Sequence, residues 1–388
     1  MQSPGRQRRR LVEAMLRDGA LADPAWISAF RQVPRHAFVP RFFAPTDRHW
    51  TAVHRGDTDW LARVYSDNVL VTQLDDDPSR WATARRDGPV PGTPTCSSSM
   101  PTIMAIMLEE LLVGNGNHVL EIGTGTGYNA ALLCHRLGSA CVSTVDIDAD
   151  LVRAAKIRLA TCGYHPACAV GDGVKGFPDN APYQRVLSTC AVSAIPAAWL
   201  EQTAPGGFIV TTLNRPIGAG LVRIEVGAGA VGQGRVLARD GRFMPLRAHR
   251  VADPDGLVTA IHRDHGSPRR THLPIREVLD PSHPFEFFAG LALPEVSAAL
   301  DPAQPSVAFL VHADGSWTRH QSRDGEHLVT QGGPRRLWDL VETAYQEWLA
   351  LGAPSRDRFG ITVSPDRQVL WLDSPGSPHR WPLASART

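Results

Sequence analysis

The densest group of residues suited to chemistry lies at 119–128, where the sequence is VLEIGTGTGY. The apolar start of this segment predicts a strand that runs into a glycine-rich turn. Because glycine has no Cβ atom, a ligand can lie against the main chain there, and the amides that open the next helix can face it. The dinucleotide fingerprint needs glycine at position 128, where this chain has Tyr128. The G-x-G-x-G form, preceded by the acidic Glu121, therefore favours S-adenosylmethionine over NAD.

Two acidic residues farther along the chain extend this predicted site. Asp146 ends the second predicted strand, about 20 residues past the turn, where a carboxylate can accept hydrogen bonds from both ribose hydroxyls. Asp172, in a G-D-G triplet after the third strand, is placed to hold the adenine edge. Either acid alone is more simply a solvated loop residue or a helix cap, so the argument depends on their combined spacing. The expected cofactor-binding set is Glu121, Gly123, Thr124, Gly125, Gly127, Asp146, Asp172 and Gly173.

The elements that must position these residues follow from periodicity. From residue 99 onward strands and helices alternate, which indicates a parallel sheet covered on both faces. The predicted helices are 101–114, 128–137 and 148–162, and the predicted strands are 119–122, 143–145, 167–170, 186–188 and 208–212. After residue 214 the pattern loosens into short strands such as 221–226 and 307–311, a helix at 335–351, and a hairpin of 359–363 and 369–372. Before residue 99, helical spacing at 10–43 is followed by a stretch without a period at 74–95, which we interpret as a long loop.

The predicted fold class is α/β, a Rossmann-like S-adenosylmethionine-dependent methyltransferase fold with a C-terminal α+β extension. A chain of 388 residues exceeds the size of one hydrophobic core, so more than one domain is expected. We expect an N-terminal helical segment with a substrate-side loop over 1–98, the cofactor-binding core over 99–214, and a C-terminal α+β domain for peptide recognition over 215–388.

Composition narrows the classes of partner. A formal net charge of +1 provides no broad field for nucleic acid or an anionic membrane. No segment approaches the roughly 18 apolar residues of a membrane helix, and no apolar run follows the N-terminal arginines as in a signal peptide. We therefore expect a cytoplasmic protein. The six cysteines lack CxxC pairs and zinc-type spacing, which predicts free, mostly buried thiols and no metal site.

Several ordered motifs resemble the protein-L-isoaspartate O-methyltransferase family over roughly 25–214. They are VPRHAFVP at 33–40, Tyr65 and Asp67, SMP at 99–101, the glycine segment, GDG at 171–173, APY at 181–183, Ile195-Pro196, LEQ at 200–202 and PGG at 205–207. The resemblance implies methylation of a carboxylate on an aspartyl or isoaspartyl residue of a peptide or protein, with S-adenosylhomocysteine as the product.

The same resemblance implies an active-site serine. The family carries it in an S-x-P pattern twenty residues before the strand of the glycine segment, which here is Ser99 with Pro101. In the family this serine holds the substrate carboxylate. Ser97 and Ser98 are adjacent alternatives, and Ser99 could instead cap the helix that follows.

Two departures from the family pattern bear on the substrate. About twenty additional residues lie between Asp67 and Ser99, and about 170 residues follow the core. Extended members look like the actinobacterial methyltransferases of lanthipeptide and graspetide biosynthesis, which convert an aspartate of a macrocyclic peptide to an aspartimide. We expect that role, with the 74–95 stretch and the C-terminal region selecting the substrate. The alternatives are repair of isoaspartate in damaged proteins and, from another class, a non-catalytic peptide-binding protein on a methyltransferase fold.

Overall fold

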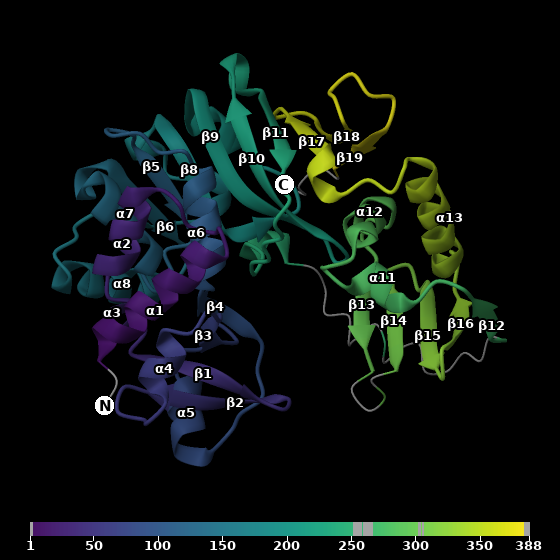
Figure 1. The fold of residues 1–388 in the computed structure, drawn as a ribbon, viewed down its shortest axis with the longest axis horizontal. Helices are drawn as coiled ribbons and strands as arrows, with labels where there is room; N and C mark the ends of the chain where they lie inside the picture. The colour runs from purple at the N-terminus through teal and green to yellow at the C-terminus, as the bar shows by residue number, and fades with distance from the viewer. Residues whose placement is uncertain (1–2, 251–257, 259–266, 302–303, 305, 384–388) are drawn as a thin grey trace. The chain divides into compact units, whose positions relative to one another are not determined.

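The computed structural model of the chain describes residues 3–250, 258, 267–301, 304 and 306–383. It divides into two compact units (Figure 1). The first unit contains residues 1–190, 196–211 and 223–232, and the second contains 191–195, 212–222 and 233–388. Each unit is therefore assembled from separate stretches of the chain.

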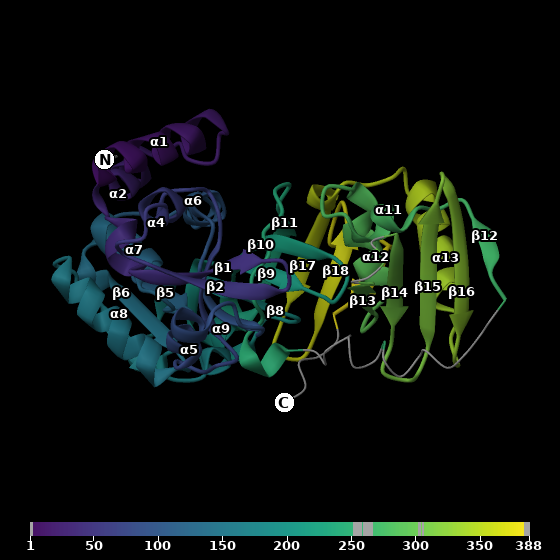
Figure 2. The same ribbon diagram turned by 90° about the horizontal axis from the view of Figure 1, so that it is seen from below.

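A parallel sheet that alternates with helices forms the centre of the first unit (Figure 2). Its strands are β5 (Val119–Ile122), β6 (Val142–Asp146), β7 (Ala167–Val170) and β8 (Tyr183–Val192), and its helices are α7 (Tyr128–Leu137), α8 (Ala149–Thr161) and α9 (Ala197–Gln202). β5 pairs in parallel with β6 and β8, and β6 pairs in parallel with β7. All four residues of β5 are buried, as expected for a strand covered on both faces. The predicted α/β alternation is confirmed.

Local sequence explains where these helices begin and end. Gly127 and Gly138 flank α7, and both have positive φ angles, of 85° and 86°, which glycine adopts without strain. Asp148 caps α8 by accepting hydrogen bonds from the amides of Asp150 and Leu151. α6 (Pro101–Glu110) starts with a proline, whose fixed φ suits the first turn of a helix.

The N-terminal part of the first unit combines helices with an antiparallel sheet. The helices are α1 (Pro4–Arg17), α2 (Pro24–Gln32), α3 (Arg35–Phe38), α4 (Trp60–Val64) and α5 (Arg80–Asp87). The strand order is β2-β1-β3-β4, formed by β1 (Arg41–Thr46), β2 (His49–His54), β3 (Leu70–Leu74) and β4 (Pro94–Ser98). Tyr128 of α7 packs against Phe30 of α2, with ring centroids 6.5 Å apart. The helical spacing at 10–43 is confirmed for α1 to α3, but its last residues already belong to β1.

The prediction of a long loop at 74–95 is wrong, because this stretch contains α5 and the start of β4. Most residues of α5 are polar, so the helix gives little periodic signal in the sequence. Two of its three apolar side chains, Trp81 and Ala84, pack into a cluster with Phe43 and Val71 of the neighbouring strands. Tertiary packing, rather than local sequence, determines the helix.

Three further strands have residues in both units: β9 (Thr203–Asn214), β10 (Ala219–Val226) and β11 (Gly232–Val236). β9 continues the first unit's sheet next to β8. In the second unit, β17 (Phe359–Val363), β18 (Gln368–Leu372) and β19 (Arg380–Pro382) are neighbouring antiparallel strands. The predicted hairpin of the first two is confirmed.

The rest of the second unit is a five-stranded antiparallel sheet with helices. The sheet has the order β12-β16-β15-β14-β13, and its strands are β12 (Arg269–Thr271), β13 (Ser297–Leu300), β14 (Val307–Val311), β15 (Trp317–Arg323) and β16 (Glu326–Gly332). The helices are α11 (Ile275–Leu279), α12 (Pro284–Ala292) and α13 (Leu337–Ala350). The predicted C-terminal α+β region, including the helix near 335–351, is confirmed.

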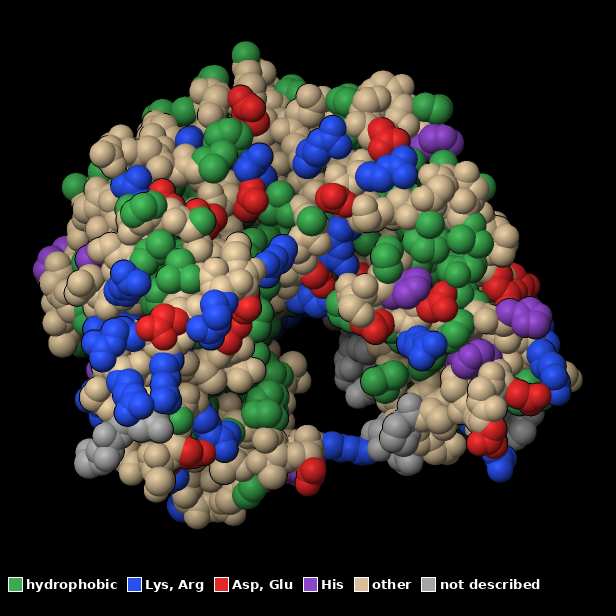
Figure 3. Space-filling model, viewed as in Figure 1, with side chains coloured by type: hydrophobic (Ala, Val, Ile, Leu, Met, Phe, Trp, Pro, Cys, Tyr) green, Lys and Arg blue, Asp and Glu red, His purple; other side chains and the backbone are tan. Residues whose placement is uncertain are grey.

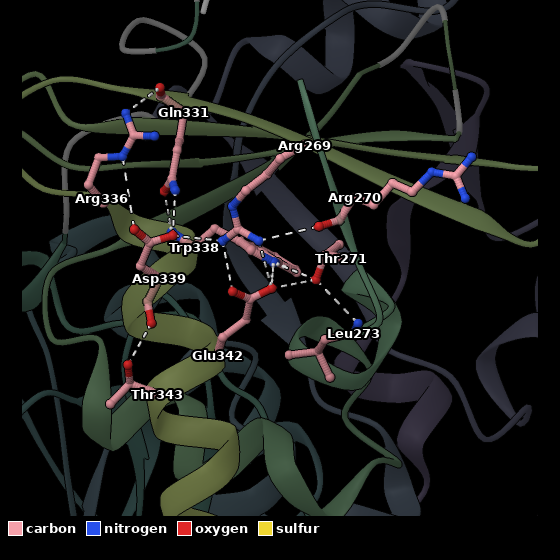
Figure 4. A network of polar contacts seen from close by, with 10 residues as sticks. All are labelled: Arg269, Arg270, Thr271, Leu273, Gln331, Arg336, Trp338, Asp339, Glu342 and Thr343. Atoms are coloured by element: carbon pink, nitrogen blue, oxygen red, sulfur yellow. Dashed lines mark hydrogen bonds and ion pairs between the residues drawn. The ribbon is translucent and has the colours of Figure 1, made fainter. Parts of the chain in front are cut away.

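A polar network holds α13 against this sheet (Figure 4). Nη2 of Arg269 on β12 lies 2.6 Å from Oδ1 of Asp339 and 2.7 Å from Oε2 of Glu342. The Thr271 hydroxyl donates to Glu342 Oε1 at 2.6 Å, and it accepts a hydrogen bond from Trp338 Nε1 at 2.9 Å. These bonds fix the position of the helix along the edge strand.

The surface mixes both signs of charge, with basic and acidic side chains interspersed on the face shown in Figure 3. The six cysteines are free, as predicted, but two are buried and four are half-buried. In the described part of the chain, no three or more His, Cys, Asp or Glu side chains are grouped as metal ligands. Nor does any described helix have the length and apolar character needed to cross a membrane.

Candidate active site

The glycine turn joins β5 to α7, and its backbone excludes other residues. Gly123, Gly125 and Gly127 have φ angles of 94°, 48° and 85°. A Cβ atom at Gly123 would lie 2.8 Å from the Cys190 Sγ atom, and one at Gly127 would lie 3.2 Å from the Ala155 Cβ atom. The turn therefore needs glycine both for its conformation and for its close packing.

Asp146 fastens this turn to the end of the adjacent strand. Its Oδ2 atom accepts a hydrogen bond from the Gly125 amide at 2.9 Å, and its Oδ1 atom accepts one from the Asp148 amide at 3.1 Å. The Asp146 carbonyl in turn accepts a bond from the Gly171 amide at 2.9 Å. The turn, the end of β6 and the start of the G-D-G triplet thus lie together at one edge of the sheet, where ligands bind in open α/β folds.

Asp172 and Gly173 follow at the same edge. The Asp172 side chain accepts a hydrogen bond from the Val174 amide at 3.0 Å and caps a short 3₁₀ turn, Gly173–Lys175. The Gly173 carbonyl accepts the indole N–H of Trp199 at 2.7 Å. These bonds hold the triplet in a fixed conformation.

Two buried polar side chains stabilise the turn: Glu121 belongs to β5, and Thr124 belongs to the turn itself. Glu121 is fully buried, and its two oxygens accept hydrogen bonds from Asn129 Nδ2 at 2.7 Å and from the Thr144 hydroxyl at 2.6 Å. The Thr124 hydroxyl lies 2.7 Å from that of Thr144 and continues the chain of bonds. Burial raises the pKa of Glu121 to about 7, although both donors oppose the shift. Both side chains therefore stabilise the turn through hydrogen bonds in the protein interior.

The serine run lies directly beside the glycine turn. A Cβ atom at Gly125 would lie 3.6 Å from Cys96 Sγ and 3.7 Å from the Ser97 carbonyl oxygen. Because side chains alternate along β4, Ser98 is 3% exposed whereas Ser97 is half-buried. Ser99, which follows the strand, is also half-buried. The Ser98 hydroxyl is buried and has no hydrogen-bond partner within the described residues. Ser97 and Ser99 are therefore the more accessible of the three serines.

Ser99 does not cap the helix that follows, so that alternative is wrong. The N-cap residue of α6 is Met100, and no side chain of the cap position bonds to the helix. Asp67 takes this role instead, accepting the Thr102 amide at 2.8 Å and its hydroxyl at 2.6 Å. Pro101 is the first residue of α6 and is buried.

A residue whose role the sequence did not reveal holds this region in place. The Arg35 guanidinium is fully buried. It donates hydrogen bonds to the carbonyls of Val64 (2.9 Å), Ser66 (3.1 Å), Asn68 (3.1 Å), Ser98 (3.4 Å) and Ser99 (2.9 Å). Burial lowers its pKa to about 10, so it stays protonated at neutral pH. One side chain thus connects the 64–68 loop to the serine run.

Comparison with known proteins gives a consistent result. The model of the family described as Protein-L-isoaspartate(D-aspartate) O-methyltransferase (PCMT) matches residues 80–245. A protein-L-isoaspartate O-methyltransferase of Methylorubrum populi is 33% identical over 217 residues, which cover 56% of this chain and 84% of that protein. One of Methylorubrum extorquens is 34% identical over 251 residues, covering 64% and 91%.

A solved structure of a protein-L-isoaspartate O-methyltransferase has a similar fold, with a TM-score of 0.53 and 19% identity. The similarity covers 95% of this chain and 100% of that one. The structural similarity therefore extends into the residues after 214.

Proposed function

This chain belongs to the protein-L-isoaspartate O-methyltransferase family, and from that premise we propose that it modifies an aspartyl residue of a ribosomally made, macrocyclised peptide. As a member of the family it is an S-adenosylmethionine-dependent carboxyl O-methyltransferase. In the proposed role the product is a methyl ester that closes to an aspartimide.

One observation carries the proposed site: the strand with the serine run lies beside the glycine turn, so close that a Cβ atom at Gly125 would be in van der Waals contact with Cys96 and Ser97. The turn, Asp146 and Asp172 would hold S-adenosylmethionine through its methionine, ribose and adenine portions, respectively. Ser99 would donate a hydrogen bond to the substrate carboxylate and turn one of its oxygens toward the methyl group. Ser97, which is also half-buried, is the nearest alternative.

The methyl transfer needs no strong general base. A carboxylate oxygen attacks the sulfonium methyl carbon, the S–CH₃ bond breaks, and S-adenosylhomocysteine leaves with the electron pair. Because the ordinary pKa of a carboxyl group is about 4, the nucleophile is already ionised at neutral pH. Alignment and partial desolvation of the two reactants are what the protein must supply.

Aspartimide formation follows without another catalyst. The backbone nitrogen of the residue after the ester attacks the ester carbonyl, loses its proton, and expels methanol. A five-membered succinimide ring remains. Relative to the starting peptide, the product has gained a methylene group and lost methanol, so its mass is lower by one water.

The choice of a macrocyclic substrate is supported by the segment between Asp67 and Ser99, where this chain is longer than the family pattern. That segment contributes α5, which packs on the small antiparallel sheet beside the proposed site. Repair of isoaspartate in damaged proteins is the second candidate. The names of the relatives and the full-length similarity to a solved structure favour it.

Mass spectrometry separates the two candidates. Macrocyclised peptides, their linear forms and short isoaspartyl peptides would each be incubated with the protein and S-adenosylmethionine. We expect a methyl ester, followed by loss of methanol, on a macrocyclised peptide only. Efficient methylation of short linear isoaspartyl peptides would instead establish the repair function.

Substitution of the serine tests the site. Ser99→Ala should lower kcat about 10- to 100-fold, the loss expected for one hydrogen bond to a charged group. Its dissociation constant for S-adenosylhomocysteine should stay within about twofold of the wild-type value. Ser28→Ala, on the exposed side of α2, is the matched control. If Ser97→Ala loses rate and Ser99→Ala does not, the role belongs to Ser97.

A further inference from the structure

A cavity of about 110 Å³ lies in the first unit, between the small antiparallel sheet and α8. Residues of β1, β3, α5 and α8 line it, together with Thr126 of the glycine turn. Its apolar walls include Phe38, Phe43 and Leu151. Because Thr126 belongs to the turn, the cavity borders the proposed cofactor site.

Two arginines bring positive charge to this cavity. The guanidinium of Arg41 lies over the ring of Trp81, with Cζ 4.9 Å from the ring centroid. The Arg158 guanidinium donates one long hydrogen bond, of 3.4 Å, to the Thr126 carbonyl. Neither arginine forms an ion pair with an acidic residue in the described part of the chain. Burial lowers the pKa of Arg158, and the positive charge of Arg41 contributes to the shift.

The acidic residues of the cavity already have other partners. Asp150 Oδ1 lies 2.5 Å from Nη2 of Arg153, which is exposed on α8. Asp77 accepts the Ser79 amide at 2.8 Å just before α5 begins. The Trp81 Nε1 atom, by contrast, is buried and has no acceptor within the described residues. The two guanidiniums thus line the cavity together with Asp77 and Asp150, whose carboxylates have partners of their own.

We propose that this cavity binds a carboxylate of the peptide substrate, carried by an acidic residue near the one that is methylated. The proposal rests on the proposed function for the identity of the ligand. Guanidinium groups present paired N–H donors that match the two oxygens of a carboxylate or phosphate. The apolar walls suit the methylene groups of an acidic side chain. The peptide substrate would therefore carry a second acidic residue close to the residue that is methylated.

Binding measurements with full-length protein test the cavity without requiring turnover. The probes are glutarate, inorganic phosphate, and two peptides that differ only in one glutamate or glutamine near the target aspartate. We expect glutarate to bind, and Arg41→Gln or Arg158→Gln to weaken its binding about tenfold. Lys156→Gln, on the exposed side of α8 and away from the cavity, is the matched control. Arg41 is exposed, so its variant is expected to fold normally.

Kinetics provide the second readout. In the wild-type protein the glutamate peptide should have a KM about tenfold lower than the glutamine peptide, and either arginine variant should abolish this difference. Equal affinity of wild type and both variants for all probes would overturn the proposal. Arginine-dependent binding of phosphate but not glutarate would overturn the assignment to a carboxylate. Arginine-dependent binding of glutarate without methyl transfer to any peptide would support the cavity and count against the proposed function.

Discussion

The Arg35 side chain shows what a single residue contributes to this site. Five carbonyl groups surround its guanidinium, and they belong to the 64–68 loop and to the serine run. A lysine ammonium has only three donors and lacks the planar fork, so it cannot reach the same set of acceptors. At least two of the five carbonyls would then lose their donor.

Arg35→Lys should therefore lower the free energy of unfolding by about 3 kcal/mol, the typical cost of breaking a buried charged network. Because the Ser98 and Ser99 carbonyls lose their donor, kcat should also fall, while the affinity for S-adenosylhomocysteine changes little. Urea unfolding, methyl-transfer kinetics and calorimetry measure these quantities. Arg31→Lys, on the exposed surface of α2, is the control. A variant with wild-type kcat would show that Arg35 does not position the serines.

Glu121 leads to a prediction about pH. Its pKa of about 7 in the folded chain lies above the ordinary value of 4.5, so the folded state favours the protonated form. This contribution to stability is complete below pH 4.5 and is lost as the pH rises through 7. Its size is on the order of 3 kcal/mol. In urea unfolding from pH 5 to 8, wild-type stability should fall relative to that of Glu121→Gln. Parallel profiles of the two proteins would contradict the raised pKa.

At the residue scale the sequence predicted what is local. Gly123, Gly125 and Gly127 are recognisable because the turn that needs their positive φ angles is formed by one short segment of the sequence. The role of Arg35 could not be predicted, because its acceptors lie 29 to 64 residues away along the chain. Which of the three serines acts stays a prediction, and the structure adds that the Ser98 side chain is buried.

At the scale of elements, the parallel sheet was predictable and the small antiparallel sheet was not. Strands buried on both faces, such as β5, are short continuous apolar runs bounded by turn residues. β1 has the sequence RFFAPT, with a proline and no regular alternation. Its partner β2 follows directly as a hairpin, whereas its other partner, β3, comes from a later segment of the chain. α5 depends in the same way on Trp81 and Ala84 packing against strands that the sequence did not indicate.

The five-stranded sheet has its own expected response to acid. His320 on β15 is fully buried, and its Nε2 atom lies 3.3 Å from the Leu273 carbonyl, to which the neutral ring donates. Burial lowers its pKa to about 4 from 6.5. The resulting stabilisation is complete above pH 6.5 and is lost as the pH falls toward 4. At most it is on the order of 3 kcal/mol.

Hydrogen exchange can locate this effect. Between pH 7 and pH 5, after correction for intrinsic exchange rates, amides of β14, β15 and β16 should lose protection. His320→Gln keeps a donor for the Leu273 carbonyl but does not titrate, so its sheet should keep its protection. If the variant loses protection as much as the wild type does, another group is responsible.

At the scale of the whole molecule, no single boundary in the sequence separates the two units. A sequence suggests boundaries from changes in pattern, whereas the first unit is assembled from three separate ranges. Arg223 illustrates the difference, because it lies beyond the last predicted core strand yet pairs with Glu110 of α6 at 2.6 Å. Recognition of the substrate by residues 215–388 stays a prediction. A truncation that tests it should retain residues 223–232.

Cofactor binding should distinguish the two units, because the proposed cofactor residues all belong to the first. A ligand that binds only the folded state stabilises it by RT ln(1 + [L]/Kd), or about 2.7 kcal/mol at 100 times Kd. With S-adenosylhomocysteine at that concentration, the slowest amides of β5 and β6 should exchange about 100-fold more slowly. Amides of the five-stranded sheet should exchange at unchanged rates. Asp146→Asn, which weakens the predicted ribose contact, should reduce the protection of β5 and β6. Equal slowing of β13–β16 would show instead that the two units unfold as one.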